Sequence, residues 1–172
     1  VELPSEFQFF GTTYSHLCVS TNGFVAFGES LNMSCSAKPQ DHTTPSTSNP
    51  NNLIAAWWTD LNCTDRCSMY AGIDPETGAF VVTWDTVSYA EDISADNVTV
   101  QCQLWDDGRI GIVAAEFPSP LEGGRVPVIG IEDSAGAAGI HVRGILGSVT
   151  PPVPIEFVPW ISYRPGWRSV GP

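Results

Sequence analysis

Apolar and polar residues alternate over short stretches of this chain, which is the pattern of half-buried β-strands. The clearest stretch is 97–105, where the even positions are apolar and the odd positions are polar or aromatic. The apolar positions are Val98, Val100, Cys102 and Leu104. Because successive side chains of a strand point to opposite faces, these four are predicted to line a core. Trp105 is predicted to lie on the polar face.

Similar short strands are predicted along the rest of the chain. They cover residues 7–10, 14–19, 24–27, 53–58, 69–73, 80–87, 109–117, 126–131, 140–145 and 154–163. Asn22-Gly23 predicts a type I′ hairpin turn, with positive φ at both residues. Pro- and Gly-containing turns at 74–78 and 106–108 predict two more hairpins. The prolines of the last strand place it at a sheet edge. Any helix is limited to one turn near 90–96.

This pattern predicts an all-β fold, an antiparallel two-sheet β-sandwich of jelly-roll type with little or no helix. The 172 residues, 42% of them hydrophobic, suffice for one domain with a core. We expect residues 1–172 to be a single extracellular domain, a module or fragment of a larger secreted protein. Residues 153–172 form its Pro/Trp-rich terminal segment. Residues 32–52, rich in Ser, Thr, Pro and Asn, are expected to form a long surface loop.

The chain is strongly acidic, with a net charge of −12 from 19 acidic and 7 basic residues. Such a surface repels phosphate backbones and anionic lipid headgroups, so nucleic acid is not an expected partner. No apolar run is long enough to span a bilayer, so membrane insertion is not expected. Solubility explains the charge, and divalent-cation binding is the alternative.

Cysteines and glycosylation motifs both indicate a secreted protein. Three of the seven asparagines begin Asn-X-Ser/Thr motifs, namely Asn32, Asn62 and Asn97. They are predicted to carry N-linked glycans. The disulfide candidates are Cys63, Cys67, Cys18 and Cys35, of which the first two are close enough in sequence for a local bridge. Five cysteines leave at least one thiol free or bonded to another chain, and Cys102 is expected to be a buried free thiol.

Six motifs follow one another in a defined order. They are Phe7-Gln8-Phe9-Phe10-Gly11, Ser20-Thr21-Asn22-Gly23-Phe24, Asn52-Leu53-Ile54-Ala55-Ala56-Trp57-Trp58-Thr59-Asp60-Leu61, Phe80-Val81-Val82-Thr83-Trp84, Gln103-Leu104-Trp105-Asp106-Asp107-Gly108 and Gly130-Ile131-Glu132-Asp133. This order resembles the nidogen-like modules and related β-sandwich modules of secreted proteins, over roughly residues 3–135. The resemblance implies a non-catalytic module of extracellular matrix, adhesion or cell-surface proteins. It implies other protein chains as partners, either copies of itself or matrix components.

Asp60, Asn62 and Asp65 place oxygen ligands near one another, which makes them weak calcium candidates. The stretch lacks the glycine and the distal glutamate of an EF-hand loop. A polar turn closed by Cys63 and Cys67 is the alternative. Calcium is the one cofactor that the sequence leaves open.

The chain contains no GxSxG or HExxH motif, so it is not expected to be an enzyme. A glycoside-active enzyme on a jelly roll remains a remote alternative. Trp57, Trp58 and Trp84 fit the core of the resemblance.

The interface or ligand candidates are Trp105, Trp160, Tyr163 and Trp167. Trp105 either packs between strands or stacks on a sugar, as in a carbohydrate-binding accessory module. The terminal aromatics dock either on their own sheet or on a neighbouring subunit, and the second case predicts a homo-oligomer or polymer.

Overall fold

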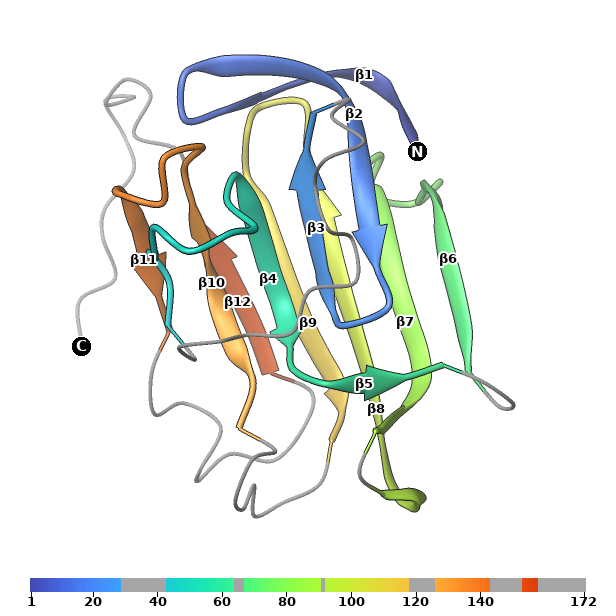
Figure 1. Ribbon diagram of the computed structural model, residues 1–172. Coiled ribbons are helices and arrows are strands. Elements are labelled where there is room, and N and C mark those ends of the chain that lie inside the picture. The colour runs from blue at the N-terminus through green and yellow to red at the C-terminus, as the bar shows by residue number, and fades with distance from the viewer. Residues whose placement is uncertain (29–42, 64–66, 91, 118–125, 143–152, 158–172) are drawn as a thin grey trace, which may run out of the picture.

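The computed structural model describes residues 1–28, 43–63, 67–90, 92–117, 126–142 and 153–157. For residues 92–96, 153–154 and 157 only the backbone is described. Within these ranges the regular elements are strands, arranged as two antiparallel six-stranded sheets that face each other (Figure 1). Over the same ranges no helix is long and apolar enough to cross a bilayer. The predicted two-sheet β-sandwich is confirmed.

The first sheet is built mainly from the N-terminal third of the chain. Its order is β1 (Glu2–Phe9), β2 (Thr12–Ser20), β3 (Phe24–Phe27), β4 (Leu53–Trp58), β10 (Val128–Glu132) and β11 (Gly139–His141). The second sheet runs β12 (Val153–Phe157), β9 (Ile110–Glu116), β8 (Asp92–Leu104) and β7 (Phe80–Tyr89). On the far side of β7 lie β5 (Leu61–Asn62) and β6 (Ser68–Ile73), each paired with a different part of it.

Most predicted strands are present, and the hairpins β2–β3, β6–β7 and β8–β9 are confirmed. β12 is an edge strand, as its prolines predicted. The one place where a helical turn was allowed, near 90–96, is strand instead, because β8 begins at Asp92 and pairs with β7 from there. The two-residue strand β5 was not predicted, since its existence depends on a partner about 27 residues further along the chain.

The hairpin loop between β2 and β3 has three residues rather than two. Ser20 pairs with Phe24, which leaves Thr21, Asn22 and Gly23 in the loop. Gly23 has a φ of 80°, but Asn22 is not among the residues with positive φ. The predicted type I′ turn is therefore wrong in its detail. A three-residue loop that ends with glycine in the left-handed region is the next most common hairpin connection.

Asn22 and Gly23 of this loop are buried, and their polar groups bond to β4 and to the segment that follows β4. The Gly23 carbonyl accepts hydrogen bonds from Ala56 N (3.0 Å) and Trp57 N (2.9 Å). The Asn22 side-chain oxygen accepts one from Leu61 N at 3.1 Å. A three-residue loop would otherwise leave these groups unpaired in the interior, which is costly. The loop is thus locked against β4.

The main core lies between the two sheets and is formed by the alternate apolar residues of both. From the second sheet it takes Val98, Val100, Cys102 and Leu104, as the alternation in 97–105 predicted. Trp57 from β4 and Trp84 from β7 are fully buried in it. The Trp57 indole N–H donates to the Tyr89 hydroxyl at 3.2 Å, which satisfies the polar atom of each ring.

A second apolar cluster lies on the opposite, outer face of the first sheet. It comprises Phe24, Ala26, Leu53, Ala55, Trp58 and Val128, all at most 5% exposed. The rings of Phe24 and Trp58 pack at 5.2 Å between centroids. This sheet is therefore apolar on both faces, which explains why its strands are continuous hydrophobic runs.

Residues 43–52 bond to the β10–β11 end of this outer face, where Figure 1 draws them in front of the first sheet. The Thr44 hydroxyl donates to the Ile140 carbonyl at 3.2 Å, and the side chain is only 2% exposed. Asn52 N donates to the Asp133 carbonyl at 2.9 Å. The expectation of a surface loop over 32–52 holds for Pro45 and residues 47–49, which are exposed, whereas Thr44, Pro50 and Asn52 are buried, so this segment also serves as a cover. Residues 29–42 lie outside the described ranges.

Replacement of Gly23 by alanine tests the buried loop. A Cβ at Gly23 would collide with the Trp57 carbonyl oxygen, in addition to the cost of an alanine at positive φ. Gly78 is the matched control, because its φ is 72° and nothing lies within 4 Å of its Cβ position. We expect Gly78→Ala to lower the free energy of unfolding by about 1 kcal/mol and Gly23→Ala by roughly 3 kcal/mol. Equal losses in chemical denaturation would show that the loop is not packed against β4.

Candidate functional site

The outer face of the second sheet is polar and half-exposed, in contrast to the covered face of the first. Its centre is a row of hydrogen-bonded side chains from β8 and β7. Gln103 Nε2 donates to Gln101 Oε1 at 2.5 Å, and Gln101 Nε2 donates to Thr83 Oγ1 at 3.0 Å. All three of these residues are partly exposed.

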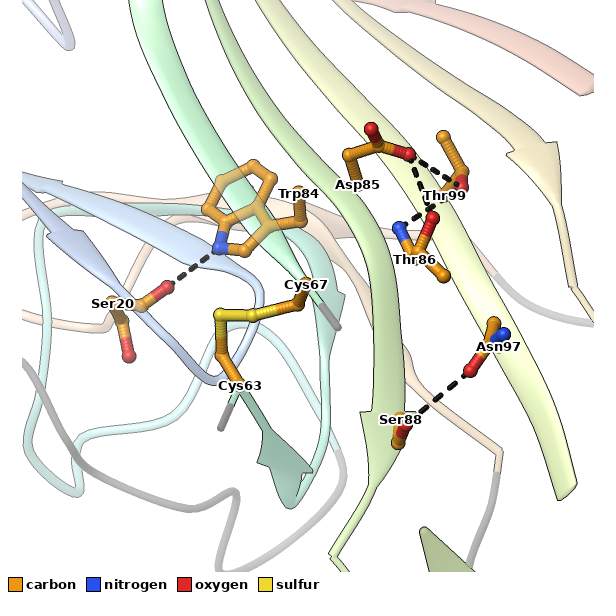
Figure 2. The surroundings of a disulfide bond; sticks show 9 residues. All are labelled: Ser20, Cys63, Cys67, Trp84, Asp85, Thr86, Ser88, Asn97 and Thr99. Carbon is orange, nitrogen blue, oxygen red and sulfur yellow. Dashed lines mark hydrogen bonds between the residues drawn. A yellow bond between two sulfur atoms is a disulfide. The ribbon is translucent and has the colours of Figure 1, made fainter. Parts of the chain in front are cut away.

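A β-bulge interrupts this face within β7. Trp84 pairs with Val100 and Val87 pairs with Val98, so β7 has one residue more than β8 over this stretch. The φ of Thr86 is 57°, which is rare for a β-branched residue and marks the bulge. Thr86 N donates to Thr99 Oγ1 at 3.2 Å, and the hydroxyls of Thr86 and Thr99 both donate to Asp85 Oδ1 (Figure 2). The bulge returns Val87 to the core and turns Ser88 outward.

The disulfide Cys63–Cys67 closes the connection between β5 and β6, as predicted. Its Cα atoms are 5.3 Å apart, and Figure 2 shows it beside Trp84. The Trp84 indole N–H donates to the Ser20 carbonyl at 2.7 Å, across the space between the sheets. Cys18 is also disulfide-bonded, whereas Cys35 lies outside the described residues. Cys102 is free and buried, as predicted.

Two of the three glycosylation candidates lie at this end of the second sheet. Asn62 is in β5 and Asn97 is in β8, and both are partly exposed. Asn97 Oδ1 accepts a hydrogen bond from the Ser88 hydroxyl at 3.3 Å. Asn32 lies outside the described residues. Glycosylation of all three stays a prediction.

Trp105 lies at the β8–β9 turn, at the other end of the same sheet. Arg109 lies over its indole ring at 4.7 Å from the centroid. The Arg109 guanidinium is held there by Asp107 at 2.9 Å and by Glu156 of β12 at 3.4 Å. A Cβ at Gly111 would come within 2.9 Å of the ring, so the indole also covers β9. The ring face beneath Arg109 is not open to a sugar, which favours packing between strands.

The calcium candidates are only partly described. Asp60 and Asn62 stand at the start of β5, and Asp65 lies outside the described residues. Among the residues that are described, no three His, Cys, Asp or Glu side chains gather where they could hold a metal ion. Calcium binding stays a prediction. So does the interface role of Trp160, Tyr163 and Trp167, none of which the structure describes.

β6 forms part of the edge of the second sheet. Within the described ranges it pairs with β7 alone, so its other side carries no strand (Figure 1). Tyr70 is 60% exposed and Ile73 is 58% exposed, which makes them the two most exposed large hydrophobic side chains among the described residues. Sequence reasoning identified β6 as a hairpin strand but not as an edge, because edges depend on the order of strands in the sheet.

Glu132 is a buried carboxylate that sequence reasoning missed. It lies on the outer face of β10 opposite Leu53, and it is 1% exposed. Ser46 N donates to Oε2 at 2.8 Å, whereas Oε1 has no partner among the described residues. Burial raises the pKa of Glu132 to about 7, and the charge of Asp133 adds to the rise while the Ser46 N–H opposes it. Glu132 thus ties residues 43–52 to the first sheet.

The family model described as NIDO related matches residues 1–150 of the chain. The chain belongs to the NIDO-related family. No curated protein and no solved structure shows a significant match to it.

Membership in the NIDO-related family confirms the resemblance that the ordered motifs indicated, and the match extends beyond residues 3–135. The family is a type of non-enzymatic, matrix-type module. The family and the Cys63–Cys67 disulfide together indicate an extracellular module, because such bonds persist in oxidising compartments.

The raised pKa of Glu132 predicts a pH-dependent stability. Below about pH 4.5 the carboxyl is protonated in both the folded and the unfolded chain, and between pH 4.5 and 7 the folded chain binds the proton more tightly. The free energy of unfolding should therefore fall as the pH rises through this window, by roughly 3 kcal/mol at most. The measurement is chemical denaturation from pH 4.5 to 8 of the native chain and of Glu132→Gln. The native chain should lose more stability than the variant, and parallel pH profiles would contradict a buried carboxyl.

The cysteine assignments predict the outcome of thiol labelling. Burial raises the pKa of the Cys102 thiol to about 12, so the native protein should not react with a thiol reagent. In denaturant without reductant we expect a single labelled thiol per chain, at Cys102, and five after reduction. Peptide mapping of the unreduced chain identifies the partner of Cys18. Rapid labelling of the native protein would mean that Cys102 is not enclosed in the core.

Proposed function

We propose that this chain is a non-catalytic extracellular module with a structural or adhesive role, and that two copies join through their β6 strands. The observation that carries the proposal is the open edge at β6. Membership in the NIDO-related family supports the extracellular, matrix-type setting.

An open strand edge offers backbone N–H and C=O groups to another strand. Natural proteins usually protect such edges with charged residues, proline, bulges or a covering segment. β6 reads Ser-Met-Tyr-Ala-Gly-Ile and contains neither charge nor proline. Its pairing with β7 is continuous over six residues, without the register shifts that interrupt β1–β2 and β7–β8. The strand is thus regular, uncharged and exposed, which suits strand addition.

Charge favours a second copy at this edge in particular. The chain carries a net charge of −12, so most surfaces of two copies repel each other. β6 contributes no charge to that repulsion. In an antiparallel pair whose two-fold axis passes through Ala71, the two Ala71 residues lie opposite each other, and Tyr70 of one copy lies opposite Gly72 of the other. The largest side chain of β6 then meets the smallest residue, which avoids crowding across the axis.

The test is the oligomeric state of the chain, measured by sedimentation over a range of concentrations. We expect a reversible dimer that Tyr70→Glu abolishes, because the two new charges lie diagonally across the two-fold axis on the same face of the joined sheet. Tyr70→Phe should still dimerise. Val126→Glu is the matched control, since Val126 is also exposed, at 53%, and lies outside β6.

Melting curves show whether each variant is folded, and at 60% exposure Tyr70 should tolerate substitution. A chain that stays monomeric at all concentrations would overturn the proposal. In that case an extended strand of a different matrix protein would be the candidate occupant. Dimers of Tyr70→Glu as stable as the native ones would place the contact elsewhere.

A further inference from the structure

Three strands align two glycosylation motifs on a single row of the second sheet. Asn62 of β5 pairs with Ser88 of β7, and Ser88 pairs with Asn97 of β8. Neighbouring strands are about 4.8 Å apart, so the two asparagines stand roughly 10 Å apart with Ser88 between them. The alignment brings together residues that are 35 positions apart in the sequence, and no sequence motif predicts that they are neighbours.

All three members of the row face outward. Their neighbours Leu61, Tyr89 and Val98 are buried in the main core, so the row itself lies on the opposite face. The bulge in β7 is what makes this so. If residues 84–88 alternated regularly, without the bulge at positions 85–86, Ser88 would point to the same side as Trp84, into the core.

The side chain of Asn97 is oriented for a substituent on its amide nitrogen. Its oxygen accepts the bond from Ser88, and Figure 2 shows the nitrogen on the side away from Ser88. The hydroxyl of Thr99, which completes the Asn97 motif, is engaged by Asp85 and by the backbone of Thr86. The folded protein thus holds the motif's hydroxyl within the bulge and leaves the nitrogen outside. This arrangement accommodates a glycan that was attached before β7 and β8 paired.

We propose that Asn62 and Asn97 both carry N-linked glycans, and that this pair closes the Ser88 end of the outer face to protein contact. In the transfer step the amide nitrogen bonds to C1 of a lipid pyrophosphate-linked oligosaccharide. The bond from C1 to the phosphate oxygen breaks, the lipid pyrophosphate leaves, and the amide loses one proton to solvent. An oligosaccharide-transferring enzyme of the secretory pathway supplies the donor.

The glycans would also limit which part of the sheet edge beside β7 is accessible to another strand. β5 and β6 lie on the same side of β7, so a glycan on Asn62 stands next to the open β6 edge. On this side of β7, strand addition is then confined to β6. The glycan pair does not depend on dimer formation, and its test uses a different measurement.

The first measurement is intact-mass analysis and glycopeptide mapping of the chain secreted from eukaryotic cells. Asn62→Gln and Asn97→Gln should each lose one glycan mass, and the double variant should keep only what Asn32 carries. Absence of a glycan at either position would overturn the proposal.

The second measurement tests whether the pair covers Ser88. Ser88→Cys is labelled with a polyethylene-glycol maleimide, once in the glycosylated chain and once in the Asn62→Gln/Asn97→Gln background. We expect labelling several-fold faster without the glycans. Gln103→Cys on the same face, six residues beyond Asn97 in β8, is the control and should react at the same rate in both backgrounds. An unchanged rate at Ser88→Cys would show that the glycans point away from the row.

Discussion

The contact between the β2–β3 loop and the end of β4 is the constraint on which the sandwich depends. Gly23 makes it feasible, because a side chain at that position would occupy the place of the Trp57 carbonyl. Two hydrogen bonds to the Gly23 carbonyl and one to the Asn22 side chain then fix β4 relative to β3 and β5. Each bond contributes only about 1 kcal/mol, but leaving any of these buried groups unpaired costs more.

The same loop joins the two sheets. Ser20, the last residue of β2, accepts the indole N–H of Trp84 from the opposite sheet. Thr59 N bonds to the Asn22 carbonyl just where the chain leaves β4, and the chain then enters β5 in the second sheet. The loop therefore determines both where the first sheet ends and where the second begins. This explains why the motifs around Asn22-Gly23 and Trp57-Leu61 belong together in one family pattern.

The local pattern of apolar and polar residues predicted much of the fold. The rest depends on contacts between residues that are far apart in the sequence. Alternation in 97–105 placed Cys102 in the core, and the cysteine spacing predicted Cys63–Cys67. The turn at Asn22-Gly23 was recognised but mistaken for a two-residue turn. The Asn22 side chain accepts a hydrogen bond from Leu61 N, far along the chain, and the local sequence does not show this bond. The bulge at Thr86 had a visible signal, since Trp84 and Val87 are both apolar but three positions apart. The burial of Glu132 had no visible signal in the sequence, because it depends on contacts with residues 43–52.

The outer face of the first sheet is apolar and that of the second is polar, and this difference follows from the sequences of their strands. The first sheet has apolar residues on both faces and needs a cover, which residues 43–52 help to supply and which Glu132 ties in place. The second sheet satisfies its outer polar side chains by bonding them to one another, so it needs no cover. Among the described residues, β6 is one of the edges of the second sheet where backbone groups face no further strand. Because backbone groups at a sheet edge are best paired by another strand, this edge supports the proposal that the chain binds a strand and not a small ligand.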